Sequence, residues 1–286
     1  MNSVLVTGLA HNVEFHIEKE IIRIEKHMAK IFSIVKFLII ESDSADRTKS
    51  ILTNMTKENK NLKLISFDKL ATVYPYRVDR ITYCRNVYVN EIRSNQQYKD
   101  IDVIAVIDFD IKNNRLNLKI LNEWLARDDW TALFANQTGA YYDIAALRSE
   151  NWCEGDCFEE YNTFAKNMDK EKAKALAIWS KMKKIPKYSE PILVESAFGG
   201  LGFYRKKVFL QFDYTLHENI AVPSEHLSLH SKINKDLDKM YIIPKLTNFS
   251  WNPHNLSKYK IFRKLDRLTT YPIFVGVRKF FRKLIP

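Results

Sequence analysis

The sequence predicts an α/β protein with one doubly wound, mixed sheet of the Rossmann type. Short apolar runs of strand length alternate with segments of helical period over the first 110 residues. Polar residues follow directly after several of these runs, where parallel strands place a ligand site. No linker, internal repeat or low-complexity run divides the 286 residues, and 46% hydrophobic residues supply a large core.

The first half repeats a strand–loop–helix unit. SVLVTGLA reads as a buried strand that breaks at Gly8, and a helix is expected from about Glu14 to Ala29. A second strand at 35–40 runs into the loop Glu41 to Arg47, where Asp46 is placed to cap a helix from Thr48. NLKLISF predicts the third strand, 77–94 a helix whose buried face includes Ile81, Val87 and Ile92, and DVIAVID the next strand. This alternation favours a mostly parallel sheet.

The pattern of apolar and polar residues changes after Trp130. Apolar runs are shorter, aromatic residues cluster, and glycines gather in SAFGGLGFYR. We expect strands of mixed direction, interrupted by a helical insertion at about 159–183. The predicted partition is one domain over 1–255, with a nucleotide-binding half (1–130) and an acceptor half (131–255), followed by a basic segment over 256–286.

Charge and cysteine content narrow the function classes. The net charge of +11 is concentrated from Lys258 onward, where the sequence has nine Lys and Arg and one acid, Asp266. Because we see no basic clustering before residue 250, a nucleic-acid-binding protein is disfavoured. No run reaches the roughly 20 apolar residues of a membrane span, and the start resembles no signal peptide. Cys84, Cys153 and Cys157 are too few for a disulfide framework and favour reduced thiols in the cytosol.

The basic segment has an amphipathic end. Ile273, Val277 and Phe280 fall on one helical face and Arg278 and Lys279 lie off it. This pattern suits a helix on an anionic membrane surface, and predicts a cytoplasmic protein at the inner face of the cytoplasmic membrane. A C-terminal helix docked on its own domain is the alternative.

The stretch VIAVIDFDIK carries the strongest chemical signal. Five apolar residues end in Asp108, Phe109 and Asp110, and two carboxylates at the end of a buried strand are costly unless a cation meets them. Mg²⁺ or Mn²⁺ accepts one or two carboxylates and takes its other ligands from phosphates and water. A D-x-D triplet is also common as a solvated strand end, so its position in the sheet decides its meaning.

Together these segments resemble the nucleotide-sugar-dependent glycosyltransferases of the GT-A fold, from about Val4 to His230. ANQTGAYYDIAALR, CEGDCF, SAFGGLGFYR and SEHLSLH are similar to the branch that includes the fungal capsule-associated mannosyltransferases and related microbial and viral enzymes. Ser224 stands where that pattern has Cys. The resemblance implies a metal-dependent transferase that moves a sugar from a nucleotide donor to a glycan or lipid-linked acceptor in surface polysaccharide synthesis.

The resemblance also implies site residues. The donor would be held by Leu9, Ala10, His11, Glu41, Asp43, Asp46, Arg80, Arg85, Asn86, Phe109 and Asp143. The metal would be held by Asp108, Asp110 and His230, with His226 as the competitor of His230. The acceptor or sugar would meet Tyr141, Tyr142, Trp152, Gly199 and Gly200.

Glu225 is implied as the base of an inverting enzyme, because the acceptor hydroxyl must lose a proton. In a retaining enzyme it would orient a substrate instead. Simpler roles stay open for other residues. Arg85 could pair with an acid on its own helix, the aromatic residues could be core, and Asp143 could cap the turn that follows it.

Two further functions compete with transfer. A nucleotidyltransferase would need a Gly-rich basic loop after the first strand, which GLAHN does not provide. An inactive scaffold on a membrane surface is the other alternative, because a fold does not guarantee chemistry.

Overall fold

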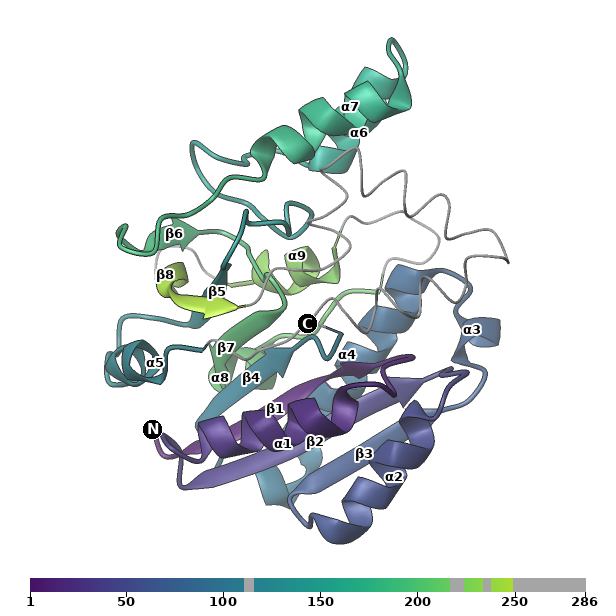
Figure 1. Cartoon of the computed structure of the whole chain (residues 1–286), viewed down its shortest axis with the longest axis vertical. Coiled ribbons are helices and arrows are strands. Elements are labelled where there is room, and N and C mark those ends of the chain that lie inside the picture. Colours follow the sequence, from purple (N-terminus) through teal and green to yellow (C-terminus); the bar gives the residue numbers. More distant parts are fainter. Residues whose placement is uncertain (111–115, 217–223, 234–237, 249–286) are drawn as a thin grey trace.

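The computed structural model describes residues 1–110, 116–216, 224–233 and 238–248. Its strands form one mixed sheet in the order β3-β2-β1-β4-β7-β5-β8-β6 (Figure 1). The strands are β1 (Ser3–Ala10), β2 (Ile34–Ser42), β3 (Leu62–Phe67), β4 (Val103–Ile107), β5 (Ala132–Gln137), β6 (Ile192–Val194), β7 (Leu201–Arg205) and β8 (Met240–Asn248). The predicted α/β mixed sheet is confirmed.

Two strands, β7 and β6, run opposite to the other six described strands of the sheet. β3, β2, β1 and β4 are parallel, as the repeated strand–loop–helix units require. β7 lies antiparallel between β4 and β5, so the second half joins the same sheet through Val103↔Arg205 and Ala132↔Tyr204. β8 is parallel to β5, and β6 is antiparallel to β8 at the far edge.

Helices cover both faces of the sheet. They are α1 (Ile17–Met28), α2 (Thr48–Glu58), α3 (Leu70–Val73), α4 (Arg77–Ser94), α5 (Leu118–Leu125), α6 (Cys157–Ala165), α7 (Lys170–Ala177), α8 (Lys207–Gln211) and α9 (Glu225–His230), with short 3₁₀ turns η1 (Gln96–Tyr98) and η2 (Trp179–Lys181). The predicted insertion is formed by α6 and α7, which project beyond the sheet at the top of Figure 1. None of the described helices is long and apolar enough to cross a membrane.

Two apolar layers follow from the alternation of side chains along the strands. Val4 and Val6 of β1 pack with α1 on one face, and Leu5 packs with α4 on the other. The predicted face of α1, which includes Ile17, Ile21, Ile24 and Met28, is buried. The three cysteines are buried and unpaired.

The predicted bounds of α4 are confirmed, but its buried face differs from the prediction. Ile92 is buried, whereas Ile81 and Val87 are only half-buried. Asp79, Thr82 and Arg85 are buried instead. The helix is therefore turned so that a polar stripe faces the ends of the strands, because Arg85 has buried partners there. The basic segment 256–286, its amphipathic helix and its membrane contact lie outside the described residues.

Candidate functional site

The parallel strands β1, β2 and β4 end at the same edge of the sheet, and their loops meet there. Gly8 makes this meeting possible. A Cβ atom on Gly8 would lie 2.0 Å from the carbonyl oxygen of Ile107 and 2.9 Å from the ring of Phe109. The Phe109 ring is fully buried, and its carbonyl accepts a hydrogen bond from His16 Nε2 (2.8 Å). Phe109 thus anchors the Asp108–Asp110 segment by packing, in place of the predicted contact of its side chain with a donor.

The loops after β1 and β2 are tied to one another by side chains. Asn12 Oδ1 accepts from the Ala45 amide (2.8 Å), and a nitrogen of the His11 ring, Nδ1, lies 2.7 Å from the Ser42 carbonyl. Asn12 and Asp43 both adopt left-handed backbone with φ of 54°, which is uncommon for residues with a side chain. Such backbone strain is concentrated at functional sites.

Three acids at the end of β2 and in its loop are held by local hydrogen bonds or buried. Glu41 is buried, accepts from the Ser44 amide (3.0 Å) and bonds the Ser66 hydroxyl. Asp46 accepts from the Thr48 amide (2.9 Å), the first amide of α2, although Arg47 and not Asp46 occupies the N-cap position. Oδ2 of Asp43 is buried and has no hydrogen-bond partner in the described part of the chain. A buried acceptor without a donor fits a ligand that brings one.

Leu9 and Ala10 support this loop pair from below. Leu9 is partly buried against the α4-side layer, and Ala10 is buried in the α1-side layer. Their side chains belong to the core, so only their backbone can face a donor.

Four carboxylates converge next to the loops. They are Asp108, Asp110, Asp143 and Glu225. Burial, followed by repulsion from Asp110, raises the pKa of Asp108 to about 8, and the Glu225 and Asp143 carboxylates act on Asp108 in the same direction. About a third of the Asp108 side chain is exposed, and Asp110 is exposed. The concentration of negative charge at the end of β4 is a site that attracts a cation.

Arg85 is the cation of this cluster within the described residues. Its Nε donates to Glu225 Oε1 (2.7 Å), and its Nη2 lies 3.8 Å from Asp108 Oδ1. The guanidinium lies over the rings of Phe198 and Tyr214, at 5.4 and 5.6 Å from their centroids. Although burial opposes its charge, the Glu225 carboxylate raises the pKa of Arg85. The alternative of an ion pair within α4 is therefore wrong, since the partners come from β4 and α9.

The loop before β7, which contains Gly199 and Gly200, is hydrogen-bonded to two of the carboxylate residues. Asp108 donates its amide to the Gly200 carbonyl (2.9 Å), and the Gly199 amide donates to Asp143 Oδ2 (3.0 Å). Gly199 and Gly200 have φ of 68° and 83°, and a Cβ on Gly199 would lie 2.9 Å from Gln137 Nε2. Asp143 also accepts weakly from the Ala146 amide (3.4 Å), as the capping alternative predicts.

Tyr142 is the aromatic residue that faces the carboxylates. Burial and then the charges of Asp108 and Asp143 hold the pKa of its phenol well above the usual range. The phenol therefore keeps its proton and can donate it to an acceptor atom in the site.

Several predicted site residues have structural roles instead. Tyr141 is fully buried and its hydroxyl accepts from the Phe198 amide (3.2 Å), while Trp152 Nε1 donates to the Lys181 carbonyl (2.8 Å). Both rings pack edge-to-face at 5.4 Å, so the core alternative holds for them. Arg80 donates to the carbonyls of Tyr74 and Pro75.

Asn86 clamps the chain before α9. Its amide donates to the Tyr214 carbonyl (2.8 Å) and its oxygen accepts from the Tyr214 amide (2.9 Å). Both polar ends of this side chain are used inside the fold, which replaces the predicted donor contact.

His230 lies in the core beneath the site. Its Nδ1 is 2.8 Å from Ser196 Oγ and its Nε2 is 3.0 Å from the Tyr204 hydroxyl. Burial lowers its pKa to about 3. Since both ring nitrogens have partners, the geometry does not favour His230 as a metal ligand.

His226 is also buried, and stacks on Phe198 with centroids 3.8 Å apart. Its Nε2 lies 3.5 Å from Glu225 Oε1, and burial holds its pKa well below the usual range. Phe198, Tyr88 and Tyr214 were missed as supports of Arg85. The aromatic density of the second half was their only signal in the sequence.

A divalent cation fits the two strand-end carboxylates, but only with help from a ligand. Across the described ranges, no group of three or more His, Cys, Asp or Glu side chains is arranged to hold a metal. Asp108 and Asp110 provide two carboxylates, one exposed and one with a raised pKa. This is the protein contribution expected for Mg²⁺ or Mn²⁺ that also binds phosphates.

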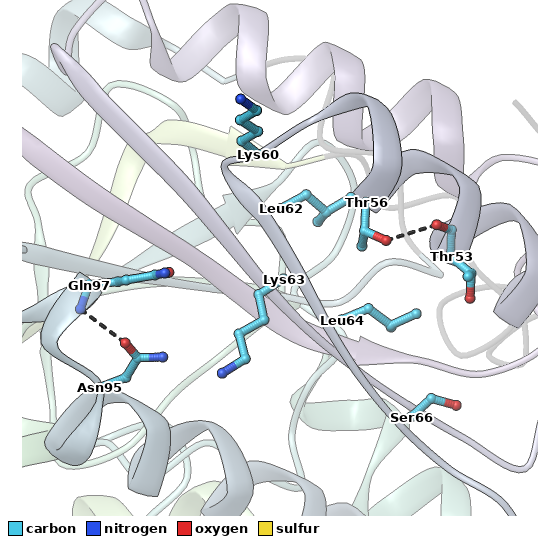
Figure 2. A pocket seen from close by; sticks show the side chains of 9 residues that line it. All are labelled: Thr53, Thr56, Lys60, Leu62, Lys63, Leu64, Ser66, Asn95 and Gln97. Carbon is cyan, nitrogen blue, oxygen red and sulfur yellow. Dashed lines mark hydrogen bonds between the residues drawn. The ribbon is translucent and has the colours of Figure 1, made fainter.

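A separate pocket of about 520 Å³ lies at the edge strand β3 and shares no residue with this cluster (Figure 2). Thr53 and Thr56 of α2 line one side, and Asn95 and Gln97 line the other. Lys63 in this pocket pairs with Glu91 (2.7 Å). Charged side chains on an edge strand protect it from pairing with other chains, and we assign the pocket no catalytic role.

No protein-family model matches the sequence, and no curated protein matches it. Solved structures that align with the chain include the mannosyltransferase PcManGT from Pyrobaculum calidifontis in complex with GDP-Man and Mn²⁺, at 12% identity and a TM-score of 0.47, over 86% of this chain and 56% of that one. S. aureus TarS 1-349 in complex with UDP aligns at 11% identity with a TM-score of 0.49, over 87% of this chain and 60% of that one. Glucosyl-3-phosphoglycerate synthase from Mycobacterium tuberculosis, in complex with Mn²⁺, UDP and phosphoglyceric acid, aligns at 10% identity with a TM-score of 0.42. The alignment covers 85% of this chain and 69% of that one. This chain spans less than two thirds of the length of the first two. These likenesses are distant, and they assign no role to any residue of this chain.

Proposed function

We propose that the chain is a metal-dependent glycosyltransferase that uses a nucleotide-sugar donor. The observation that carries the proposal is that Asp110, Asp143 and Glu225 converge on Asp108, while Arg85 contacts Glu225 and Asp108, at the edge where the β1 and β2 loops lie. Reactions that expel a nucleoside diphosphate need positive charge beside the phosphates and a base beside the acceptor. The cluster supplies residues for both.

The nucleoside would lie on the β1 and β2 loops. Asp43 presents a buried oxygen that has no donor, and Glu41 and Asn12 hold the strained loops around it. A base N–H or a ribose hydroxyl would satisfy this oxygen. We propose that His11 and Asp46 act by shaping these loops.

The phosphates would meet the end of β4. Asp108 and Asp110 would hold Mn²⁺ or Mg²⁺, which when bound neutralises charge on the departing diphosphate. The neutral phenol of Tyr142 would donate a hydrogen bond to an oxygen atom of the nucleotide sugar. Asp143, fixed by the Gly199 amide, would accept a hydrogen bond from a sugar hydroxyl.

Glu225 would take the proton of the acceptor hydroxyl in an inverting reaction. Its position at the first turn of α9 is fixed by Arg85 on one side and approached by His226 on the other. Ser224 caps this helix through the His226 amide (3.3 Å), so the departure from the family Cys preserves a local structural role. In a retaining reaction the same carboxylate would orient the acceptor.

The acceptor and the location are broader proposals. We propose a glycan or lipid-linked glycan acceptor in surface polysaccharide synthesis, and a peripheral position at the inner face of the cytoplasmic membrane. The sequence of the basic segment, with nine Lys and Arg from Lys258 onward, supports this location. A relation to the fungal capsule-associated branch is proposed on the quoted motifs alone.

A thermal-shift screen tests the function. Purified protein is heated with UDP, GDP, CMP or dTDP, each with Mn²⁺ and with EDTA. We expect one nucleotide to raise the melting temperature only with Mn²⁺, and the rise to be lost in Asp110→Asn. A matched Asp100→Asn variant, at an exposed acid outside the cluster, should keep the full shift. The absence of any shift would instead support the inactive scaffold, and a response confined to nucleoside triphosphates would support a nucleotidyltransferase.

A further inference from the structure

A dense basic surface lies beside the proposed acceptor side of the site. From Lys172 to Ser189 the chain has six lysines and no acid. Lys183, Lys184 and Lys187 are exposed, and none of them has an ion pair with a described residue. The expectation that basic residues do not cluster before residue 250 is therefore wrong.

Backbone pairing places this segment against the site. The Tyr141 amide donates to the Lys183 carbonyl (2.8 Å), and Ala140 and Lys184 form an antiparallel bridge. Tyr142 and Asp143 of the carboxylate cluster follow directly in the chain. The lysine-bearing segment is thus a direct neighbour of the segment that carries the proposed site residues Tyr142 and Asp143.

A second segment adds to the same surface. The buried Asn136 side chain donates to the carbonyls of Ile185 (3.2 Å) and Pro244 (2.9 Å), which fixes 185–187 beside the middle of β8. Lys245 is exposed, and its ammonium group lies 5.9 Å from the centroid of the Tyr188 ring. Tyr188 is 83% exposed. We define the lysine rim as Lys183, Lys184, Lys187 and Lys245 with Tyr188.

The rim is held in place from beneath. Met182 and Ile185 are buried, so the lysines between and after them stand on an anchored backbone. None of the four rim lysines has an ion pair with a described residue, and a local excess of positive charge favours an anionic ligand. The exposed tyrosine offers an apolar ring face of the kind on which sugars stack.

We infer that the lysine rim binds an acidic glycan, and that the acceptor of the proposed transferase carries carboxylate or phosphate groups. The inference rests on the proposed function, because it identifies the neighbouring carboxylate cluster as the point of transfer. A glycan is favoured over a membrane because backbone contacts join the rim segment to the segment that carries Tyr142 and Asp143 of the proposed transfer site. It is favoured over a nucleic acid because the rim adjoins residues proposed to contact sugar.

The test compares two triple variants with the wild-type full chain. Lys183→Gln/Lys184→Gln/Lys187→Gln removes three rim charges. Lys19→Gln/Lys26→Gln/Lys30→Gln removes three exposed charges on and after α1 and is the matched control. Circular dichroism and melting temperature confirm that each variant folds. The probes are fluorescent polygalacturonate, fluorescent dextran of similar length, single-stranded RNA, and vesicles with and without phosphatidylglycerol.

We expect wild type and control to bind polygalacturonate but not dextran, with affinity that falls as salt rises, and the rim variant to bind at least tenfold more weakly. Equal binding by the rim variant, or equal binding to dextran, would overturn the inference. So would a rim-dependent affinity confined to RNA or to anionic vesicles. Failure of the nucleotide screen together with rim-dependent glycan binding would refute transfer and leave the acidic-glycan surface intact.

Discussion

Arg85 of α4 donates from Nε to Glu225 Oε1 of α9 at 2.7 Å, joining two segments 140 residues apart. The pair is enclosed, with only 4% and 11% of the two side chains exposed. The same guanidinium reaches toward Asp108 at 3.8 Å. One side chain therefore links the proposed base to the proposed metal-binding strand end.

Replacement of Arg85 should destabilise the fold. Arg85→Met leaves Glu225 without its buried partner, and loss of one member of a buried pair costs about 3–5 kcal/mol in the free energy of unfolding. Urea titration measures the change. Arg127→Met, which breaks an exposed pair with Asp129, should cost no more than about 1 kcal/mol. Equal losses of unfolding free energy in the two variants would show that the buried pair stabilises the fold no more than the exposed pair.

Replacement of Glu225 should separate chemistry from donor binding. Glu225→Gln keeps an oxygen for Arg85 but cannot accept a proton, so we expect sugar transfer to fall about 10²–10⁴-fold. Nucleotide affinity with Mn²⁺, measured by calorimetry, should stay within about twofold. Glu18→Gln, at an exposed position on α1, is the control. Unchanged transfer in Glu225→Gln would exclude Glu225 as the base.

Stabilisation by Mn²⁺ should increase with pH. The folded pKa of Asp108 is raised to about 8, whereas an unfolded Asp titrates near about 4. The folded protein therefore binds the proton more tightly, and its stability falls as pH rises between these values. Metal must displace that proton, so the rise in melting temperature with Mn²⁺ should be larger at pH 8 than at pH 6. In Asp110→Asn the repulsion is removed, and both the metal effect and its pH dependence should shrink. A rise that is equal at both pH values would contradict the raised pKa.

A methyl group at Gly8 should disturb the junction of β1 and β4. The added Cβ would overlap the Ile107 carbonyl at 2.0 Å, and overpacking of a core typically costs about 1–3 kcal/mol. The urea midpoint of Gly8→Ala should fall accordingly, and nucleotide affinity should fall with it because Asp108 follows Ile107. At Gly155 the nearest contact of such a Cβ is 3.4 Å, so Gly155→Ala should be nearly neutral. A neutral Gly8→Ala would mean that the strands separate easily.

Local patterns were enough to predict the sheet edge that carries the site. Strand runs, polar loops and the acids after β4 are read within a few residues, and the structure brings Asp43, Asp108 and Asp110 to that edge. Arg85 and Glu225 were both expected in the site from the motif resemblance, but their pairing was not. A contact between residues 140 positions apart leaves no mark in either segment.

The misplaced residues share a physical cause. Successive residues on a helix point about 100° apart, so Arg85 and Asn86 cannot both face the same site. The same rotation separates Glu225 from His230, and His230 turns into the core beside Tyr204. A motif gives residue types and spacing, whereas the rotation of its helix is set by packing against the rest of the protein. The same limitation applies to the loop after β5, where Tyr141 is fully buried and Tyr142 is half-buried.

Because β4 pairs with β7, one edge of β4 stays unpaired during synthesis until β7 has been made. β4 is apolar on both faces, and its partner strand β7 begins only at Leu201. At the usual 5–20 residues per second, synthesis from Ile107 to β7 takes on the order of ten seconds. During that interval the nascent protein presents apolar strand faces and an edge of unpaired backbone N–H and C=O groups. Chaperones that bind nascent chains should therefore engage this protein most strongly between the emergence of Ile107 and that of Arg205.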